Sequence, residues 1–422
     1  MSAYWPACPR LSPLRILGRR SKCLDRGGSI PMQKSLAMFV SAPVIEAGSG
    51  KLVLDKKFVS GMALHVQHWS GPVTCFIRRG ATDIPFGGRY DIGELDFRVR
   101  ILEPEERVSV DHLADFDLAL LSGDSYLDLL APEAIRKARS AVVYSIEYTH
   151  QTRLQIISLD DTRSLPRKIY GMAWTVMQEY KRKRAFRAAR GIQANGYPAH
   201  TAYRDMGGSQ LLYLDNRMKP AMFATPQEMN ARKRHLLSGE PLRLIHSGRL
   251  EPMKGAQDLV PIARLLGERG VDFTLTIYGE GSLSGAISAD IHKHWLQDCV
   301  FLKDPVDFER ELVPLTRNRA DIFLSCHRQS DPSCTYIETM GCGVPIAGYD
   351  NKMWSALMAE SKAGWIAPLG DIRAMADRLA ALDKDRASIL ERAENALQFA
   401  QGWDFESQFR KRMEHLENLT RH

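Results

Sequence analysis

The chain has 422 residues, of which 44% are hydrophobic and 25% charged, and its formal net charge is +7. This length predicts two or three domains, and the composition is that of a globular protein with a sizeable core. No apolar run approaches the roughly 18 residues that a membrane span needs. The seven cysteines form no C-x-x-C pair, which argues against a zinc site and favours a reducing, cytoplasmic setting. The positive charge favours anionic or phosphorylated partners.

The first 33 residues differ from the rest of the chain. They are rich in arginine and lysine, and Asp25 is their one acidic residue. We predict a basic, disordered extension for residues 1–33. A start of the native protein at Met32 is the alternative, because the first strand-like segment comes shortly after it.

From Lys34 onward, apolar strand-like segments alternate with helical patterns, which predicts a parallel sheet covered on both faces. The expected strands are Ser35–Ser41, Pro72–Ile77, Phe97–Leu102, Asp117–Leu121, Ala141–Ile146, Gly191–Asn195 and Gln210–Leu214. Helices are expected around Phe58–Trp69, over Tyr126–Ala138 and over Pro166–Arg190. These elements predict a first Rossmann-like domain over residues 34–215, followed by a polar linker over residues 216–240 that contains two prolines.

A second alternation of strands and helices then begins. Its expected strands are Arg243–His246, Phe273–Tyr278, Val300–Leu302, Ile322–Ser325 and Pro345–Gly348, and its expected helices are Ala256–Gly267, Cys334–Met340, Ile372–Leu382 and Ala387–Gln401. We therefore predict an α/β protein with two doubly wound domains facing each other across a deep cleft, the second over residues 241–401. Residues 402–422 are expected to form a C-terminal helix that packs back on the first domain. Ligands of such sheets bind at the carboxyl ends of the strands.

Two glycine-containing loops come after strands of the second domain. In His246–Gly255, Gly248 permits a tight turn, and Arg249 and Lys254 flank the loop. Two cations beside such a turn suit a diphosphate, although a solvated loop with surface cations would look the same. The second loop contains Gly279 and Gly281 and is equally compatible with a plain turn.

The loop after Ile322–Ser325 leads into a predicted short helix. Free backbone N–H groups of Cys334, Thr335 and Tyr336 at its start would suit a phosphate. Glu338, one turn further on, is placed to accept hydrogen bonds from a ribose diol, as acidic residues do in dinucleotide folds. The alternative for Glu338 is a carboxylate that only complements the helix dipole.

The order SGRLEPMKG, YGEG, ADIFLS, ETMGCGVPIAG and GWIAPLGD resembles the C-terminal half of retaining, GT-B-fold glycosyltransferases of family 4 (glycosyl transferases group 1). The resemblance implies that Arg249 and Lys254 bind the donor pyrophosphate and stabilise the leaving nucleotide diphosphate. It implies that Glu338, the second glutamate of the family's E-x7-E motif, holds the ribose hydroxyls. The turn after the third strand of this domain would meet the base, which makes Lys303 and Asp304 candidates.

The chain departs from the family pattern at two places. The first glutamate of the motif falls at Ser330, and the nearest acid is Asp331, so either Asp331 substitutes for it or the donor sugar is held differently. Where the family often has a histidine near the reacting centre, this chain has Glu147, with His150 three residues later. Either residue is a candidate to approach the sugar or the acceptor, and a structural role is the alternative for Glu147.

The loop Glu46–Lys51 fails the P-loop pattern. By the resemblance, it occupies the place of the glycine loop that borders the cleft, where Gly48 and Gly50 would allow close backbone approach. No D-x-D sequence lies in a convincing site, since Asp383 and Asp385 flank Lys384 in a polar segment between helices. We therefore expect neither a metal nor another cofactor, and a nucleotide diphosphate sugar as substrate.

The resemblance implies transfer of a hexose-type sugar from a nucleotide diphosphate sugar, with a UDP-sugar favoured, to a hydroxyl of a saccharide or lipid-linked saccharide. Cations and aromatic side chains alternate along Trp174–Arg190, which suits an anionic membrane surface, although a solvated basic face is the alternative. No nucleic-acid reader motif is present. A nucleotide-sugar epimerase on the same fold and a non-catalytic nucleotide-sugar-binding relative remain as alternative functions.

Overall fold

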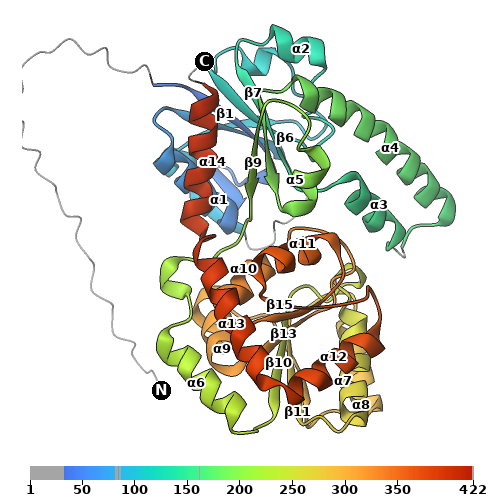
Figure 1. Ribbon diagram of the computed structural model, residues 1–422. Helices are drawn as coiled ribbons and strands as arrows, with labels where there is room; N and C mark the ends of the chain where they lie inside the picture. Colours follow the sequence, from blue (N-terminus) through green and yellow to red (C-terminus); the bar gives the residue numbers. More distant parts are fainter. Residues whose placement is uncertain (1–32, 81–83, 85–86, 161, 421–422) are drawn as a thin grey trace, which may run out of the picture. The chain divides into compact units, whose positions relative to one another are not determined.

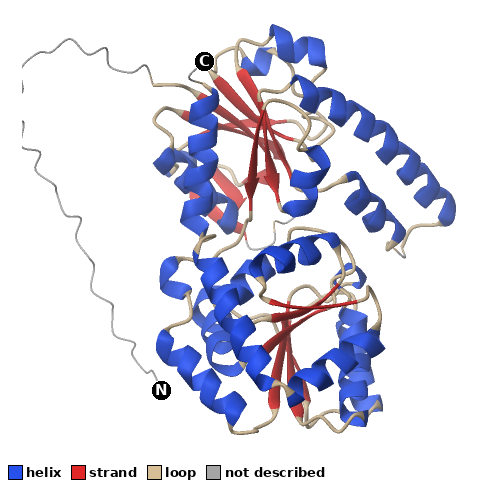
Figure 2. Ribbon diagram, viewed as in Figure 1, coloured by secondary structure: helices blue, strands red, loops and turns tan. Residues whose placement is uncertain are grey.

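The computed structural model describes residues 33–80, 84, 87–160 and 162–420. The predictions for residues 1–32 lie outside this part of the chain. The described chain is organised around two sheets, one built from residues 36–213 and one from residues 242–367 (Figure 1). Figure 2 shows helices on both sides of each sheet. This is the predicted α/β arrangement of parallel strands covered on both faces.

The elements of the first half, in chain order, are β1 (Leu36–Glu46), β2 (Lys51–Asp55), α1 (Lys56–His68), β3 (Val73–Arg79), β4 (Gly87–Asp91), β5 (Arg98–Leu102), β6 (Leu118–Ser122), α2 (Pro132–Lys137), β7 (Ala141–Ile146), α3 (His150–Ser158), α4 (Leu165–Ala188), β8 (Gly191–Asn195), α5 (Tyr197–Tyr203) and β9 (Ser209–Tyr213). Strands β6 and β8 are buried along their whole length. Such burial on both faces fits the apolar run LALLS of β6, whereas β8 (GIQAN) also buries the polar side chains of Gln193 and Asn195.

The parallel strands of this sheet run in the order β5-β3-β1-β6-β7-β8-β9. The connections change direction between β1 and β6, which makes this the topological switch point of the first sheet. The sequence did not predict β2 and β4. Strand β2 pairs antiparallel with β1, and β4 pairs antiparallel with β2. The loop containing Gly48 and Gly50 is therefore the turn of a β1–β2 hairpin, not a loop from a strand into a helix. Both glycines have positive φ, 76° and 73°, as a tight turn requires.

Two helices of the first half differ from expectation. The helix expected over Tyr126–Ala138 is reduced to α2, which starts with Pro132 in its first turn. Helix α4 is present, but Phe186 is fully buried and Arg182 pairs with Glu179 inside the protein at 2.8 Å. Neither side chain contributes to the basic surface that was predicted for Trp174–Arg190.

The elements of the second half are α6 (Pro226–Leu237), β10 (Leu242–Ser247), α7 (Leu259–Glu268), β11 (Phe273–Tyr278), α8 (Ser284–Lys293), β12 (Val300–Lys303), α9 (Val313–Arg319), β13 (Ile322–Ser325), α10 (Cys334–Gly341), β14 (Ile346–Tyr349), α11 (Lys352–Ser361), β15 (Gly364–Ala367), α12 (Ile372–Lys384), α13 (Arg386–Gln401) and α14 (Phe405–Leu419). All six strands are parallel, in the order β12-β11-β10-β13-β14-β15. The switch point of this sheet lies between β10 and β13.

The segment predicted as a polar linker over residues 216–240 contains the helix α6. Its first residue is Pro226, and Thr225 and Glu228 form a reciprocal capping box at its start. Proline is favoured in the first helical turn, where its missing N–H is not needed. The prolines that suggested a break therefore mark the beginning of a helix.

The last helix, α14, packs against α1 and β9 of the first half. Met413 and Leu416 belong to the same buried cluster as Leu36 and Met38 of β1. The guanidinium of Arg412 donates to the side chain of Gln193 at 3.0 Å. The chain therefore returns to its first sheet after completing the second one.

In the part of the chain that the structure describes, every helix falls short of the length and apolar character that crossing a bilayer requires.

Candidate functional site

The candidate site lies at the switch point of the second sheet, where the loops after β10 and β13 meet. Lys254, in the loop after β10, places its Nζ 2.6 Å from Oδ2 of Asp331, in the loop after β13. Both side chains are buried, with relative exposures of 8% and 7%. Burying two opposite charges is costly unless they are paired, so this ion pair fixes the two loops against each other.

Several polar atoms around this pair are buried without a hydrogen-bond partner among the residues that the structure describes. They are Oδ1 of Asp331, Nδ1 of His327, Oε1 of Gln329 and Nε2 of His246. Buried polar groups are normally hydrogen-bonded, so such a group of exceptions indicates a missing ligand or solvent. Burial also lowers the pKa of His246, to about 4, so its imidazole is neutral at physiological pH. The sequence singled out only Asp331 among these residues.

Arg249 takes no part in the ion pair between Lys254 and Asp331. Its side chain is exposed, and in the described structure no hydrogen bond or ion pair fixes its guanidinium. Gly248, one residue earlier, has a φ of 151° and ends the strand in the predicted turn. Lys254 is therefore positioned in advance of any ligand, whereas Arg249 is free to move toward one.

The two predicted glycine loops pack against each other. A Cβ on Gly279 would lie 1.9 Å from the carbonyl oxygen of Gly248, and one on Gly281 would lie 2.5 Å from that of Leu250. The backbone N–H of Gly248 donates to the carbonyl of Tyr278 at 3.0 Å. Both glycines therefore allow close backbone contact between loops, which is a structural role beside the predicted contact with the donor.

An open cavity of about 660 Å³ lies beside these loops. Its lining includes Gly279, Gly281, Lys303 and Asp304. The structure thus brings together the glycine loop and the two residues predicted to meet a base.

Glu338 in α10 is buried and forms a bidentate ion pair with Arg217. The two nitrogens of Arg217 donate to the two carboxylate oxygens at 2.7 and 2.8 Å. The guanidinium also stacks on the ring of Phe308, 3.7 Å from its centroid. Because each carboxylate oxygen has a second acceptor position, Glu338 can still accept a hydrogen bond from a diol while Arg217 holds it in place.

The start of α10 is only partly as predicted. The side chain of Ser333 makes no capping hydrogen bond, and Cys334 and Thr335 occupy the first helical positions, whose N–H groups have no partner within a helix. The N–H of Tyr336 already donates to the carbonyl of Ser333, and its ring is fully buried. Tyr336 is therefore set in the core, and the available amides are those of the first two residues.

The loop Ser330–Cys334 also contacts the first half of the chain. The Ser330 N–H donates to Gln155 of α3 at 3.3 Å. At the other end of the loop, Cys334 Sγ lies 3.5 Å from Nζ of Lys57, which forms an ion pair with Asp215 at 2.6 Å. The loop is thus held against α1 and α3 of the first half of the chain.

Glu147 lies just after β7, at the carboxyl edge of the first sheet. Its N–H donates to Asp124 at 2.9 Å. Burial, and then the charges of Asp124, Asp215 and Asp331, raises the pKa of Glu147 to about 7. Asp331, from the loop after β13, makes the smallest of these contributions. A carboxyl group with this pKa can hold or release a proton near neutral pH.

His150 lies in the first turn of α3, and its Nε2 is buried without a partner within the described protein. It lines a cavity of about 600 Å³ together with residues of α4, α5 and α11. That cavity is lined by neither Glu147 nor Asp331. The structure therefore separates the two candidates that the sequence could not tell apart.

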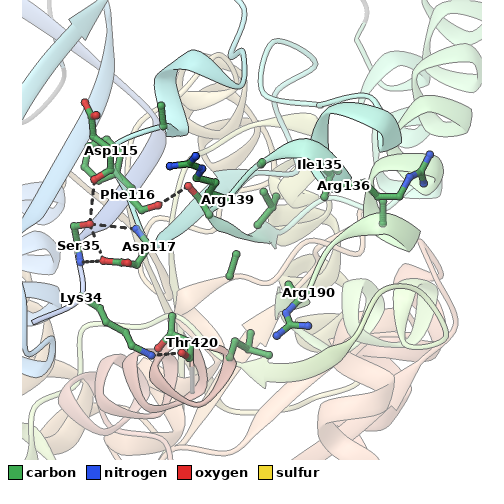
Figure 3. Close-up of a pocket in the computed structure, with 17 residues that line it drawn as sticks. Lys34, Ser35, Asp115, Phe116, Asp117, Ile135, Arg136, Arg139, Arg190 and Thr420 are labelled. Carbon is green, nitrogen blue, oxygen red and sulfur yellow. Dashed lines mark hydrogen bonds between the residues drawn. The ribbon is translucent and has the colours of Figure 1, made fainter. Parts of the chain in front are cut away.

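A further cavity, of about 630 Å³, lies at the opposite edge of the first sheet (Figure 3). Lys34, Asp117 and Arg190, which line it, precede β1, β6 and β8. Since ligands of open parallel sheets bind at the carboxyl ends of the strands, this cavity is separate from the candidate site.

A family model and several known proteins match parts of this chain. Residues 227–401 match the family model described as glycosyl transferases group 1. The chain is 30% identical over 178 residues to the amylovoran biosynthesis glycosyltransferase AmsK of Erwinia amylovora, covering 39% of this chain and 41% of AmsK. It is 31% identical over 169 residues to the putative colanic acid biosynthesis glycosyltransferase WcaL of Escherichia coli K12, covering 36% of this chain and 40% of WcaL. The matches thus span about two fifths of these curated relatives.

Solved structures share the fold over nearly the whole chain. The sucrose-phosphate synthase of Thermosynechococcus elongatus has a TM-score of 0.63 at 15% identity, covering 91% of this chain and 98% of the other. HepE of Anabaena, solved with UDP and glucose, has a TM-score of 0.59 at 16% identity, covering 91% and 100%. The fold is GT-B, as the resemblance implied.

Proposed function

We propose that this protein is a glycosyltransferase that moves a hexose-type sugar from a nucleotide diphosphate sugar to a hydroxyl of a saccharide or lipid-linked saccharide, with retention of anomeric configuration. The family match over residues 227–401 and the names of the relatives support the class of activity. Those relatives are named for amylovoran and colanic acid biosynthesis, which supports a role in bacterial polysaccharide or glycolipid assembly.

The buried Lys254–Asp331 pair carries the proposal. It lies at the switch point, where a nucleotide is expected in such a sheet, and Oδ1 of Asp331 lacks a partner in the described part of the chain. That oxygen is placed to accept a hydrogen bond from a sugar hydroxyl, the role that a glutamate at position 330 would have had. The side chain of Ser330 is engaged elsewhere, because its Oγ accepts a hydrogen bond from the backbone N–H of Lys352 at 3.1 Å.

Lys254 supplies a positive charge for the leaving nucleotide diphosphate. A preorganised charge in a site shielded from water stabilises developing negative charge without reorganisation during the reaction. Arg249 adds a second cation when it moves onto the donor, and the amides of Cys334 and Thr335 add a helix N-terminus. We propose that departure of the diphosphate needs no metal.

We propose that residues around the second sheet bind the nucleoside. The ribose meets Glu338, held by Arg217, and the base enters the cavity lined by Lys303 and Asp304. UDP is the favoured nucleotide, and the UDP and glucose bound to HepE in its crystal structure support this choice.

Glu147 and His150 remain candidates on the acceptor side. Of the two, Glu147 is favoured, because its raised pKa depends in part on the charge of Asp331. A carboxylate there can accept the proton of the attacking hydroxyl if it stands within hydrogen-bond reach.

A panel of nucleotide diphosphate sugars tests the proposal. A true donor raises the melting temperature by mass action, and incubation of that donor with saccharide acceptors yields a glycosylated product and free nucleotide diphosphate. Conversion of the sugar without an acceptor supports an epimerase instead, and binding without turnover on any acceptor supports a non-catalytic relative.

A further inference from the structure

Helix α4 buries polar side chains and exposes apolar ones along its first four turns. The side chains that it buries there are polar: Thr175, Gln178 and Glu179, and then Arg182. The large side chains that it exposes are apolar or aromatic: Leu165 (71% exposed), Ile169 (60%), Tyr170 (71%), Trp174 (37%), Val176 (55%), Met177 (45%) and Tyr180 (66%). A surface helix of a globular protein normally shows the reverse pattern.

These exposed residues form one continuous face. At about 100° per residue, Leu165, Ile169, Val176 and Tyr180 fall within about 60° of one another on the helix. Tyr170 and Met177 extend the same face on one side. The described chain has eleven exposed large hydrophobic residues, and seven of them are on α4. Such a gathering marks an interaction surface, since scattered exposed apolar residues would not be confined to one helix.

The apolar face is bordered by cations at both ends. Arg167 is exposed in the first turn, and the same face continues with Lys181, Lys183, Arg184 and Arg187. The only carboxylate of α4 is Glu179, and it is buried and paired with Arg182 at 2.8 Å. The exposed side of α4 therefore presents apolar and positively charged groups and no negative ones.

We propose that the exposed face of α4 from Leu165 to Arg187 docks on an anionic lipid bilayer. Its apolar part enters the interface between headgroups and acyl chains, and the cations at its ends contact anionic headgroups, the arrangement of an interfacial helix. A second copy of this chain fits less well, because two such faces would bring cations together without carboxylates to pair with them. Helices α3 and α4 pack against each other (Figure 1), so α3 supports the buried side of α4 and leaves the opposite side open.

This inference does not depend on the proposed activity. The surface predicted from the sequence was the basic stretch Trp174–Arg190, whereas the exposed apolar face begins at Leu165 and runs to Tyr180. The charges come from Arg167 in the first turn and from the last turns of α4.

Vesicle co-sedimentation of the full chain tests the proposal. The probes are phosphatidylcholine vesicles with and without about 30% phosphatidylglycerol. We expect binding to the anionic vesicles. The triple variant I169Q/V176Q/Y180Q should lower the partition coefficient about tenfold or more, because it removes apolar area that enters the interface.

The matched control is L237Q/W295Q/L369Q, which replaces three exposed apolar residues of the second half (64%, 85% and 50% exposed). This control should bind as the unmodified chain does, and thermal melting should show that both triple variants remain folded. Unchanged vesicle binding by the α4 variant overturns the proposal, as does equal binding to vesicles without phosphatidylglycerol.

Light scattering on the chain without vesicles tests whether the exposed face of α4 binds a second copy of the chain. The chain has a mass of 47.5 kDa, and we expect this mass in solution. A dimer that the α4 variant converts to a monomer would assign the face to self-association and overturn the proposal.

Discussion

The ammonium of Lys254 lies 2.6 Å from the carboxylate of Asp331, and both groups are buried. The pair joins the loops after β10 and β13 at the switch point of the second sheet. One carboxylate oxygen of Asp331 has no hydrogen-bond partner among the described residues. A structural ion pair and a prepared donor site are therefore built from the same two residues.

Replacing Lys254 with alanine should lower turnover by about two orders of magnitude or more, the scale of losing one preorganised charge. It also leaves Asp331 buried and unpaired, which should destabilise the fold by about 3 kcal/mol. Turnover is therefore measured beside thermal melting. The exposed Lys293 changed to alanine is the control, and near-normal turnover of Lys254→Ala would remove the main support for the proposed mechanism.

Asp331→Asn keeps the shape of the side chain and removes its charge. If Asp331 holds a sugar hydroxyl, kcat/KM for the donor should fall about tenfold or more, whereas the affinity for the free nucleotide diphosphate should change much less. Isothermal titration with the nucleotide and steady-state kinetics with the donor separate the two effects. An equal loss in both measurements would assign Asp331 only to positioning of Lys254.

Arg217→Lys should weaken nucleotide binding by about tenfold, because lysine cannot reproduce the bidentate geometry that orients Glu338. The maximum rate with saturating donor should change less than the affinity. Arg310→Lys, on the neighbouring segment, is the control. Titration of both variants with the nucleotide diphosphate measures the difference, and unchanged affinity of Arg217→Lys would show that Glu338 needs no support.

Glu147 should make stability depend on pH. Its pKa is raised from 4.5 to about 7 in the folded protein, so the folded state binds more protons than the unfolded one between these values. Its contribution to stability is complete below about pH 4.5, falls as the pH rises to about 7, and is then constant at a cost of up to about 3 kcal/mol. Glu147→Gln should therefore flatten this part of the profile and be more stable than the unmodified chain at pH 8. Parallel melting curves across the range would contradict the raised pKa.

Gly279→Ala should destabilise the protein strongly, because the new Cβ would meet the carbonyl oxygen of Gly248 and the φ of Gly279 is 148°. Gly267→Ala in α7 is the matched control, since nothing lies within 4 Å of its Cβ. Alanine is the better helix former by roughly 0.5–1 kcal/mol, so the control should be slightly more stable than the unmodified chain. Denaturant unfolding of both variants measures the contrast, and similar midpoints would contradict the close contact between the glycine loops.

The fold was predictable where local and tertiary signals agree. The predicted bounds of β7, β8, β11 and β13 agree with the structure. The apolar run of β13 is that of a strand buried on both faces, whereas β11 alternates buried and half-buried residues. The hairpin strand β4 has the sequence GGRYD, in which nothing apolar marks a strand. Helix α6 was missed although its capping box was visible, because two prolines were interpreted as breaks.

The candidate site was predictable where a motif has fixed spacing. Lys254 and Glu338 were found in this way. Arg217 stands 121 residues before Glu338, and no local pattern connects them. The exchange of faces on α4 was also invisible, because apolar residues at helical spacing normally indicate the side that faces a core. Only the structure shows which side is covered.

The return of α14 to the first sheet has a consequence for biosynthesis. Met413 and Leu416 complete the same buried cluster as Leu36 and Met38, so β1 leaves the ribosome with an apolar surface that α14 must later cover. The second sheet can form while this surface is still uncovered, because the buried clusters around its strands contain no residue of α14. The core around β1 is therefore completed only after the second sheet has been synthesised, and a chain that stops before α14 would expose this surface to aggregation.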